Sequence, residues 1–131
     1  MDTRVMTAKA NATCASLAQE MVAGRVNGLP VTDEQDNVVG VVTEFDLLKV
    51  LLLGNGGLSH VVRDVMTPQP ICVDVEHSVD HAVYLMSEHD MVQIPVTSQG
   101  RLVGTMSRRD ILRAYIAEES EIFAVTQSFD D

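Results

Sequence analysis

A chain of 131 residues that is 46% apolar is long enough to bury a core and too apolar to be disordered. Its formal charge of -10, from 19 acidic and 9 basic residues, disfavours a nucleic-acid backbone or an anionic membrane as a partner, because both attract basic surfaces. No signal peptide opens the chain and its longest apolar run, residues 50–53, is too short to span a bilayer, so we expect a cytoplasmic protein.

An internal repeat organises the chain. The pattern Gly-x-x-(Ser/Thr)-x-x-Asp occurs at residues 40–46 and again at residues 104–110. Placing Met21 on Met86 and Pro30 on Pro95 aligns residues 5–34 with the second copy without a gap, and one deletion in the following turn brings Gly40 onto Gly104. Two copies of one pattern in so short a chain indicate a duplicated structural unit.

Each repeat is predicted to begin with a short strand, at residues 5–8 and 70–73, and to continue with an amphipathic helix. Thr13 and Ser78 coincide as the N-caps of these helices. After each cap, apolar residues recur at the helical spacing i, i+3, i+4, i+7, which predicts one buried face per helix. The two stripes are Cys14, Leu17, Ala18 and Met21, and Val79, Ala82, Val83 and Met86.

A β-hairpin and a second helix complete each repeat. We expect hairpin strands at residues 26–32 and 38–42 in the first repeat, and at 91–97 and 102–106 in the second. Pro30 and Pro95 lack an amide donor, so each should lie at the start of a strand or at a sheet edge. The closing helices carry the apolar residues Phe45, Leu47, Leu48, Leu51 and Leu52, and Ile111, Leu112, Tyr115 and Ile116.

These elements divide the chain into residues 1–57 as the first repeat, 58–117 as a linker plus the second repeat, and 118–131 as an acidic C-terminal tail. The linker pattern at residues 58–70 predicts a short helical turn that runs into an extended, proline-flanked crossover. Nothing equivalent precedes the first repeat, which we therefore expect to have a truncated start. An apolar patch at residues 122–125 is either a cap or a partner contact.

The order β-α-β-β-α occurs twice, with Asp-Val-Met-Thr-Pro at residues 64–68 ahead of one copy and Ser-Arg-Arg-Asp-Ile-Leu at residues 107–112 within it. This arrangement resembles a tandem pair of cystathionine-β-synthase (CBS) domains, a Bateman module, over about residues 4 to 117. The resemblance implies an α/β fold of two CBS repeats packed with pseudo-twofold symmetry. It also implies a non-catalytic regulatory module, commonly a homodimer, whose clefts bind AMP, ADP, ATP or S-adenosylmethionine.

The second copy of the motif has side chains that suit a nucleotide. Ser107, at a helix N-cap, should lie beside unpaired amides and the positive end of the helix dipole, which favour phosphate. Arg108 and Arg109 add cationic donors, and Asp110 offers carboxylate oxygens to the ribose hydroxyls. By resemblance, Thr67 lies near the phosphates, and the adenine is enclosed by Ile71, Val73, Met91, Ile94 and Pro95.

The first copy maps onto a second cleft, which we expect to bind adenylate less tightly. Glu44 stands where the second copy has Arg108, and Thr67 has no counterpart. A lost or reversed contact of about 1.4 kcal/mol is tenfold in affinity. The residues of this weaker site are Met6, Ala8, Val26, Leu29, Pro30, Thr43 and Asp46.

Other interpretations of these residues stay open. Thr43-x-x-Asp46 and its equivalent in the second repeat also resemble capping boxes, which only begin a helix. The chain is then a ligand-free CBS dimerisation scaffold, or a fragment that regulates a larger enzyme or transporter. His77 and His81 have the spacing of metal ligands on a helix, but no third ligand is apparent, so neither a metal nor a required cofactor is expected. No nucleophile motif supports catalysis.

Two cysteines, Cys14 and Cys72, have no CxxC spacing. Buried free thiols are therefore the expectation, and a disulfide or a metal pair is the alternative.

Overall fold

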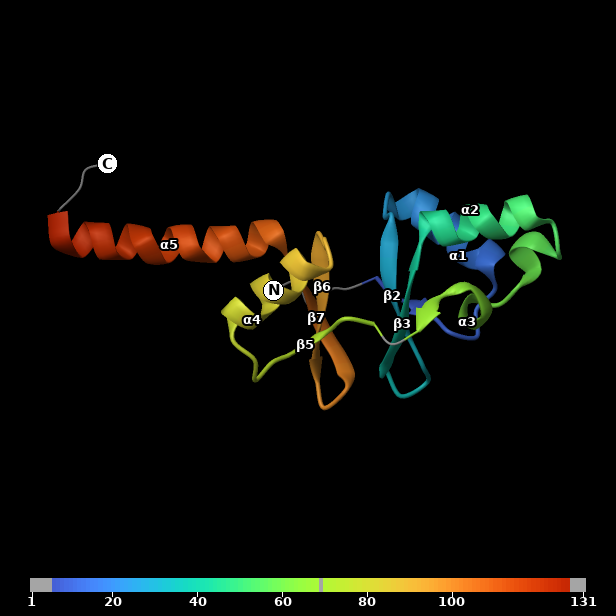
Figure 1. The fold of residues 1–131 in the computed structure, drawn as a ribbon, viewed down its shortest axis with the longest axis horizontal. Helices are drawn as coiled ribbons and strands as arrows, with labels where there is room; N and C mark the ends of the chain where they lie inside the picture. Colours follow the sequence, from blue (N-terminus) through green and yellow to red (C-terminus); the bar gives the residue numbers. More distant parts are fainter. Residues whose placement is uncertain (1–5, 69, 128–131) are drawn as a thin grey trace.

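The computed structural model describes residues 6–68 and 70–127, with side chains as far as residue 117. Two α/β units follow one another along the chain (Figure 1). The first contains β1 (Ala8–Lys9), α1 (Cys14–Gly24), β2 (Gly28–Thr32), β3 (Val38–Thr43) and α2 (Glu44–Leu53). The second contains β5 (Val73–Asp74), α4 (Val79–Glu88), β6 (Gln93–Ser98), β7 (Arg101–Ser107) and α5 (Arg108–Gln127). Between them lie the 3-10 helix η1 (Gly57–Ser59), α3 (Val62–Val65) and β4 (Thr67–Pro68).

Strand pairing confirms the alignment of the two repeats. β1 runs parallel to β2 with Ala8 opposite Val31, and β5 runs parallel to β6 with Val73 opposite Val96. β2–β3 and β6–β7 are antiparallel hairpins, as predicted, and the register of each shifts at the equivalent point after Val31 or Val96. The first strand of each unit begins later than predicted, and residue 5 lies outside the described residues.

The predicted helix caps are present. The hydroxyl of Thr13 accepts the amide of Ser16 at 3.1 Å, and the hydroxyl of Ser78 accepts the amide of His81 at 3.1 Å. In α1 three of the four residues of the predicted apolar stripe are buried, with Cys14, Leu17 and Met21 all at most 2% exposed, and Ala18 is half-buried. The stripe of α4 is only half buried, because Ala82 and Met86 join the second core whereas Val79 and Val83 are 40% and 42% exposed.

The prediction for the two prolines was wrong. Pro30 and Pro95 lie inside β2 and β6, and each of these strands has a neighbour on both sides. β1 pairs with β2 only from Val31 onward, and β5 pairs with β6 only from Val96 onward. At each proline, the side of the strand that faces β1 or β5 therefore has no partner that needs an amide donor. An inner strand can for this reason contain a proline at this position.

The crossover strand β4 belongs to the first sheet. Thr67 pairs with Val41 and Pro68 pairs with Gly40, which gives a four-stranded sheet of order β1-β2-β3-β4 beside a three-stranded sheet of order β5-β6-β7. A side chain at Gly40 would meet the backbone oxygen of Thr67 at 2.8 Å, so the close approach of β4 requires glycine here.

Reciprocal contacts between the two hairpin turns reveal the pseudo-twofold symmetry. The amide of Val38 donates to the carbonyl of Gly100 at 3.2 Å, and the amide of Leu102 donates to the carbonyl of Asp36 at 3.0 Å. These bonds exchange places under the repeat alignment, because Val38 corresponds to Leu102 and Asp36 to Gly100. Figure 1 shows the strands of the two units side by side in the middle, with α1 and α2 outside one sheet and α4 and α5 outside the other.

The last helix continues past the predicted start of the acidic tail. Instead of ending near residue 117, α5 extends to Gln127 and runs outward beyond α4 (Figure 1). The divisions at residues 57 and 117 stay predictions. In the described part of the chain, no helix combines the length and the apolar character needed to cross a membrane.

Candidate functional site

A groove of about 990 Å³ receives lining residues from both units. Its lining includes residues from equivalent positions of the two repeats, so the groove crosses the pseudo-twofold axis. These equivalent pairs are Asn27 and Val92, Gly28 and Gln93, Pro30 and Pro95, Val41 and Thr105, and Thr43 and Ser107. The groove therefore lies at the opposite end of the hairpins from the turns that bond to one another.

The walls of the groove are mainly apolar and differ between the two units. Pro30 and Pro95 face it from β2 and β6, with Ile71 and Met91 on the side of the second unit. Flat apolar walls of this kind suit a planar base. The groove has fewer polar groups. In the second unit, the Gln93 amide nitrogen donates to the Thr105 hydroxyl at 2.9 Å. The equivalent residues of the first repeat, Gly28 and Val41, have no polar side chain.

The repeated motif forms a capping box in both copies. In the first, the Thr43 amide donates to Asp46 Oδ2 at 2.8 Å and the Asp46 amide donates to Thr43 Oγ1 at 3.2 Å. In the second, the Ser107 amide donates to Asp110 Oδ2 at 3.1 Å and the Asp110 amide donates to Ser107 Oγ at 3.0 Å. The capping interpretation of the motif is therefore confirmed.

Hydrogen bonds from Ser107 lower the pKa of the Asp110 carboxyl group. The backbone hydrogen bond from Ser107 holds the pKa of Asp110 below its usual value, against the opposing effect of partial desolvation. Arg113 Nη1, at 3.8 Å from Asp110 Oδ1, adds a smaller effect in the same direction. Both aspartates are half-buried behind the caps, and neither lines the groove.

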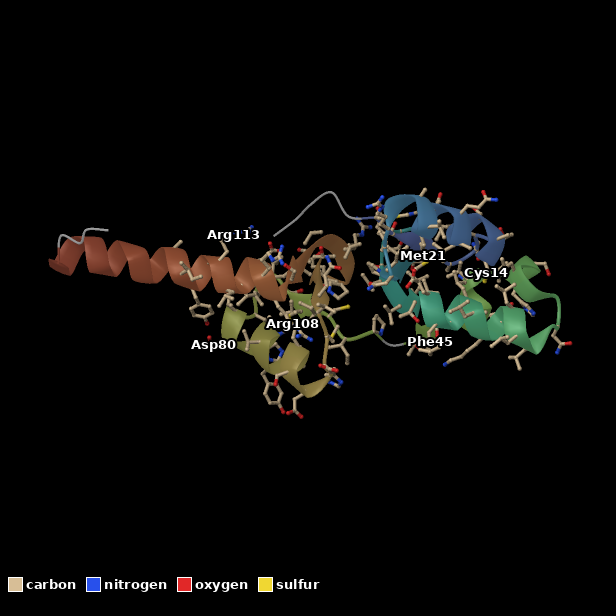
Figure 2. All side chains as sticks on the ribbon, turned by 90° about the horizontal axis from the view of Figure 1, so that it is seen from above. Cys14, Met21, Phe45, Asp80, Arg108 and Arg113 are labelled. Carbon is tan, nitrogen blue, oxygen red and sulfur yellow. The ribbon has the colours of Figure 1, made fainter. Side chains whose placement is uncertain are left out.

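The two arginines of the second motif do not line the groove. Arg108 Nε donates to the carbonyl oxygen of Met91 at 2.8 Å, and Arg108 Nη2 lies 3.5 Å from Asp90 Oδ1. This places the Arg108 side chain in a smaller cavity of about 540 Å³ between α4 and α5. Arg109 is exposed and lines neither cavity. Figure 2 shows Arg108 on the second unit and Phe45 on the first, on either side of the boundary between the units.

The structure therefore brings together some residues from both predicted sites. Residues that line the groove are Ile71, Met91, Pro95 and Ser107 from the second predicted site, and Leu29, Pro30 and Thr43 from the first. Residues that do not line it are Thr67, Val73, Ile94, Arg108, Arg109, Asp110, Met6, Ala8, Val26 and Asp46. Several of the second set are core residues: Val73, Ile94 and Ala8 are at most 3% exposed. A ligand-binding role for the residues of either set stays a prediction.

Some lining residues were missed, although hairpin register would have found four of them. Val41 lies opposite Pro30 and Thr105 opposite Pro95, and Gly28 lies opposite Thr43 and Gln93 opposite Ser107. All four follow from predicted site residues once the hairpins are aligned. The other missed residues carry no recognisable pattern in the sequence. They are Asn27, Glu44, Phe45, Leu48, Pro70, His89, Asp90 and Val92.

Histidines and thiols provide no further centre in the described part of the chain. No group of three or more His, Cys, Asp and Glu residues able to hold a metal ion is found there. The rings of His77 and His81 lie 4.5 Å apart, and His77 Nδ1 accepts the Asp74 amide at 3.0 Å. Cys14 and Cys72 are free thiols, as expected, and burial raises the pKa of both.

The sequence and the fold are both similar to those of known proteins. The family model for the CBS domain matches residues 1–53 and 62–117. The uncharacterised protein YlbB of Bacillus subtilis is 34% identical over 95 residues, which are 72% of this chain and 64% of YlbB. The chain thus spans about two thirds of the length of that relative.

Two solved structures have the same architecture. The crystal structure of CBSX2 in complex with AMP has a TM-score of 0.76 and 29% identity, and the match covers 88% of this chain and 90% of that one. The CBS domain pair of MJ0100, in complex with 5-methylthioadenosine and S-adenosyl-L-methionine, has a TM-score of 0.70 and 27% identity, with 90% of this chain and 93% of that one covered.

Proposed function

This chain belongs to the CBS domain family, and from that premise we propose that it is a non-catalytic regulatory module that binds an adenosine-containing ligand in the groove. The observation that carries the proposal is a groove of about 990 Å³ lined by equivalent residues of both repeats, including Pro30 and Pro95. A volume at the upper end of the usual range for small-molecule sites accommodates a nucleoside with a substituent at its 5′ position. The complexes of CBSX2 with AMP and of MJ0100 with S-adenosylmethionine support this ligand class.

A ligand in this groove would act by bridging the two units. At the far end of the sheets, the hairpin turns are joined by two backbone hydrogen bonds, from Val38 to Gly100 and from Leu102 to Asp36. Occupancy at the near end would favour one packing of the units over another, to the extent that the ligand binds those two arrangements with different affinity. AMP, ADP, ATP and S-adenosylmethionine are the candidate ligands, and a cytoplasmic location is part of the proposal.

Thermal unfolding with AMP, ATP or S-adenosylmethionine tests the proposal. At least one should raise the unfolding temperature, because a ligand that binds only the folded state adds RT ln(1 + [L]/Kd) to its stability. Val92, which is 64% exposed and lines the groove, is the site for an obstructing variant, Val92→Trp, which should remove the shift. Val22→Trp is the control, because Val22 is 76% exposed on α1 and does not line the groove. Equal shifts in both variants would contradict a site in this groove.

A homodimer is the second part of the proposal, because both units expose apolar helix surfaces. On α2, Phe45, Leu52 and Leu53 are 70%, 87% and 78% exposed, and Leu112 and Ile116 of α5 are also exposed. Large apolar side chains that gather on exposed helix surfaces favour association, because association removes them from water. If no ligand binds, this surface favours the alternative function of a dimerisation scaffold.

The oligomeric state can be measured by light scattering. The wild-type protein should have the mass of a dimer, and Leu52→Glu should shift it toward the monomer because a carboxylate cannot be buried there without cost. Val75→Glu is the matched control, since Val75 is also exposed but lies in the second unit outside the helices. A wild-type monomer at high concentration, or equal masses for both variants, would contradict association through α2.

A further inference from the structure

The charges in the groove differ from those that a phosphorylated ligand requires. Among the described lining residues, Glu44 and Asp90 carry negative charge at neutral pH, and none is Lys or Arg. The remaining titratable side chain of this lining is the imidazole of His89. Binding of a phosphate in a cleft usually relies on Arg or Lys side chains or on free backbone amides.

Three backbone amides around the start of α2 are already bonded in the first repeat. The Thr43 amide donates to Asp46 Oδ2 at 2.8 Å, and the Glu44 amide donates to the carbonyl of Asn27 at 3.0 Å. The Asp46 amide donates to Thr43 Oγ1 at 3.2 Å. The positive end of α2 is also compensated by the carboxylates of Glu44 and Asp46, both in its first turn.

The same amides are bonded in the second repeat. The Ser107 amide donates to Asp110 Oδ2 at 3.1 Å, the Arg108 amide donates to the carbonyl of Val92 at 3.1 Å, and the Asp110 amide donates to Ser107 Oγ at 3.0 Å. These three amides at the start of α5 are thus occupied by groups of the chain itself. A phosphate placed against Ser107 could accept a hydrogen bond from its hydroxyl, but it could use these three amides only by displacing their present bonds.

The two acidic lining residues are not equivalent. Asp90 lies 3.5 Å from the guanidinium of Arg108, which partly offsets its charge. Glu44 forms no ion pair with any described residue, although it stands at the position that Arg108 occupies in the second repeat. The uncompensated charge of the groove therefore lies on the first unit, at the start of α2.

We propose that the groove selects an adenosine derivative with a positive charge near its 5′ position, such as a sulfonium, over a phosphorylated one, with Glu44 as the counterion. This inference rests on the proposed function and adds the ligand's charge to it. A cation about 4 Å from the carboxylate of Glu44 in a solvated site gains about fivefold in affinity, whereas a phosphate there is disfavoured by repulsion. Because Glu44 is exposed, the preference should decrease as salt concentration rises.

Isothermal titration at low ionic strength tests the inference with four probes: S-adenosylmethionine, S-adenosylhomocysteine, AMP and ATP. The first two differ by the methyl group and charge of the sulfonium, so the first should bind about fivefold more tightly than the second. ATP should bind most weakly. Tighter or equal binding of AMP or ATP would overturn the preference, and the absence of binding by all four would overturn the proposed function together with it.

Variants of Glu44 separate charge from shape. Glu44→Gln should lower the affinity for S-adenosylmethionine about fivefold relative to that for S-adenosylhomocysteine, which removes the difference between the two ligands. Glu44→Lys should raise the affinity for ATP. Glu34→Gln is the matched control, because it makes the same change in an exposed turn at the opposite end of the hairpin. Equal losses of both ligands in Glu44→Gln, or the same effect in Glu34→Gln, would contradict the role of Glu44.

Discussion

Replacing Gly40 with alanine should detach the crossover strand from the first sheet. Gly40 lies in β3 directly opposite Pro68 of β4. A Cβ atom at this position would lie 2.5 Å from the Met66 sulfur and 2.8 Å from the Thr67 carbonyl oxygen. The flexible Met66 side chain can move away, but the Thr67 oxygen belongs to the paired backbone. The clash is therefore relieved only if β4 shifts from β3.

The size of the effect follows from two opposing contributions. Forcing an extra methyl group into a packed site costs about 1 to 3 kcal/mol. Replacing glycine by alanine also restricts the unfolded chain, which returns about 0.4 to 1 kcal/mol. We expect a net loss of about 1 to 2 kcal/mol in the free energy of unfolding, which corresponds to a fall of about 4 to 8 °C in Tm for a chain of this size.

Urea unfolding and calorimetry measure this loss, with Gly28→Ala as the control. Gly28 is also a strand glycine, but a Cβ there would have its nearest neighbours at 3.6 and 3.7 Å, an ordinary contact distance. The control should be as stable as the wild type or slightly more so. If Gly40→Ala and Gly28→Ala have the same stability, the close approach of β4 does not constrain residue 40 and the reasoning fails.

The carboxyl group of Asp110 and the two thiols give further predictions. The folded-state pKa of Asp110 is lowered, so its contribution to stability is present above the unfolded value of about 3.9 and is lost as pH falls through the folded value. Asp110→Asn should therefore be less stable than the wild type at pH 7 and equal to it in strong acid, and a pH-independent difference in urea unfolding would contradict this. Cys14 is 0% exposed and Cys72 is partly exposed, so a thiol reagent should modify Cys72 first in the native protein. Equal modification rates for the two thiols would contradict the prediction. A fast phase of modification that remains in Cys72→Ser would contradict it as well.

Local sequence patterns predicted the repeated unit well. The alignment that placed Met21 on Met86 is reproduced in the strand registers, and the hydroxyls of Thr13 and Ser78 cap their helices as expected. These features depend on residues a few positions apart or on a hairpin turn, so the nearby sequence is sufficient to specify them. The capping boxes of the repeated motif also belong to this class.

The same local patterns did not indicate the groove, because its lining comes from distant parts of the chain. The hydroxyl and carboxylate of Ser107 and Asp110 suit a nucleotide in isolation, but in the folded protein they bond to each other's amides. Arg108 turns toward the Met91 carbonyl, which the spacing of the motif does not indicate. The two predicted clefts contribute to a single groove because the hairpins of the two units pack around one axis.

The sequence by itself thus determined the duplicated β-α-β-β-α unit, its caps and its hairpins, since each depends on short-range hydrogen bonding and hydrophobic periodicity. Only the tertiary structure decided that Thr67 joins the sheet of the first repeat, that the repeats share one groove across their axis, and that Glu44 rather than Arg108 lines it. These outcomes depend on how two already formed units pack. Packing is set by side-chain shape and long-range contacts that no local pattern contains.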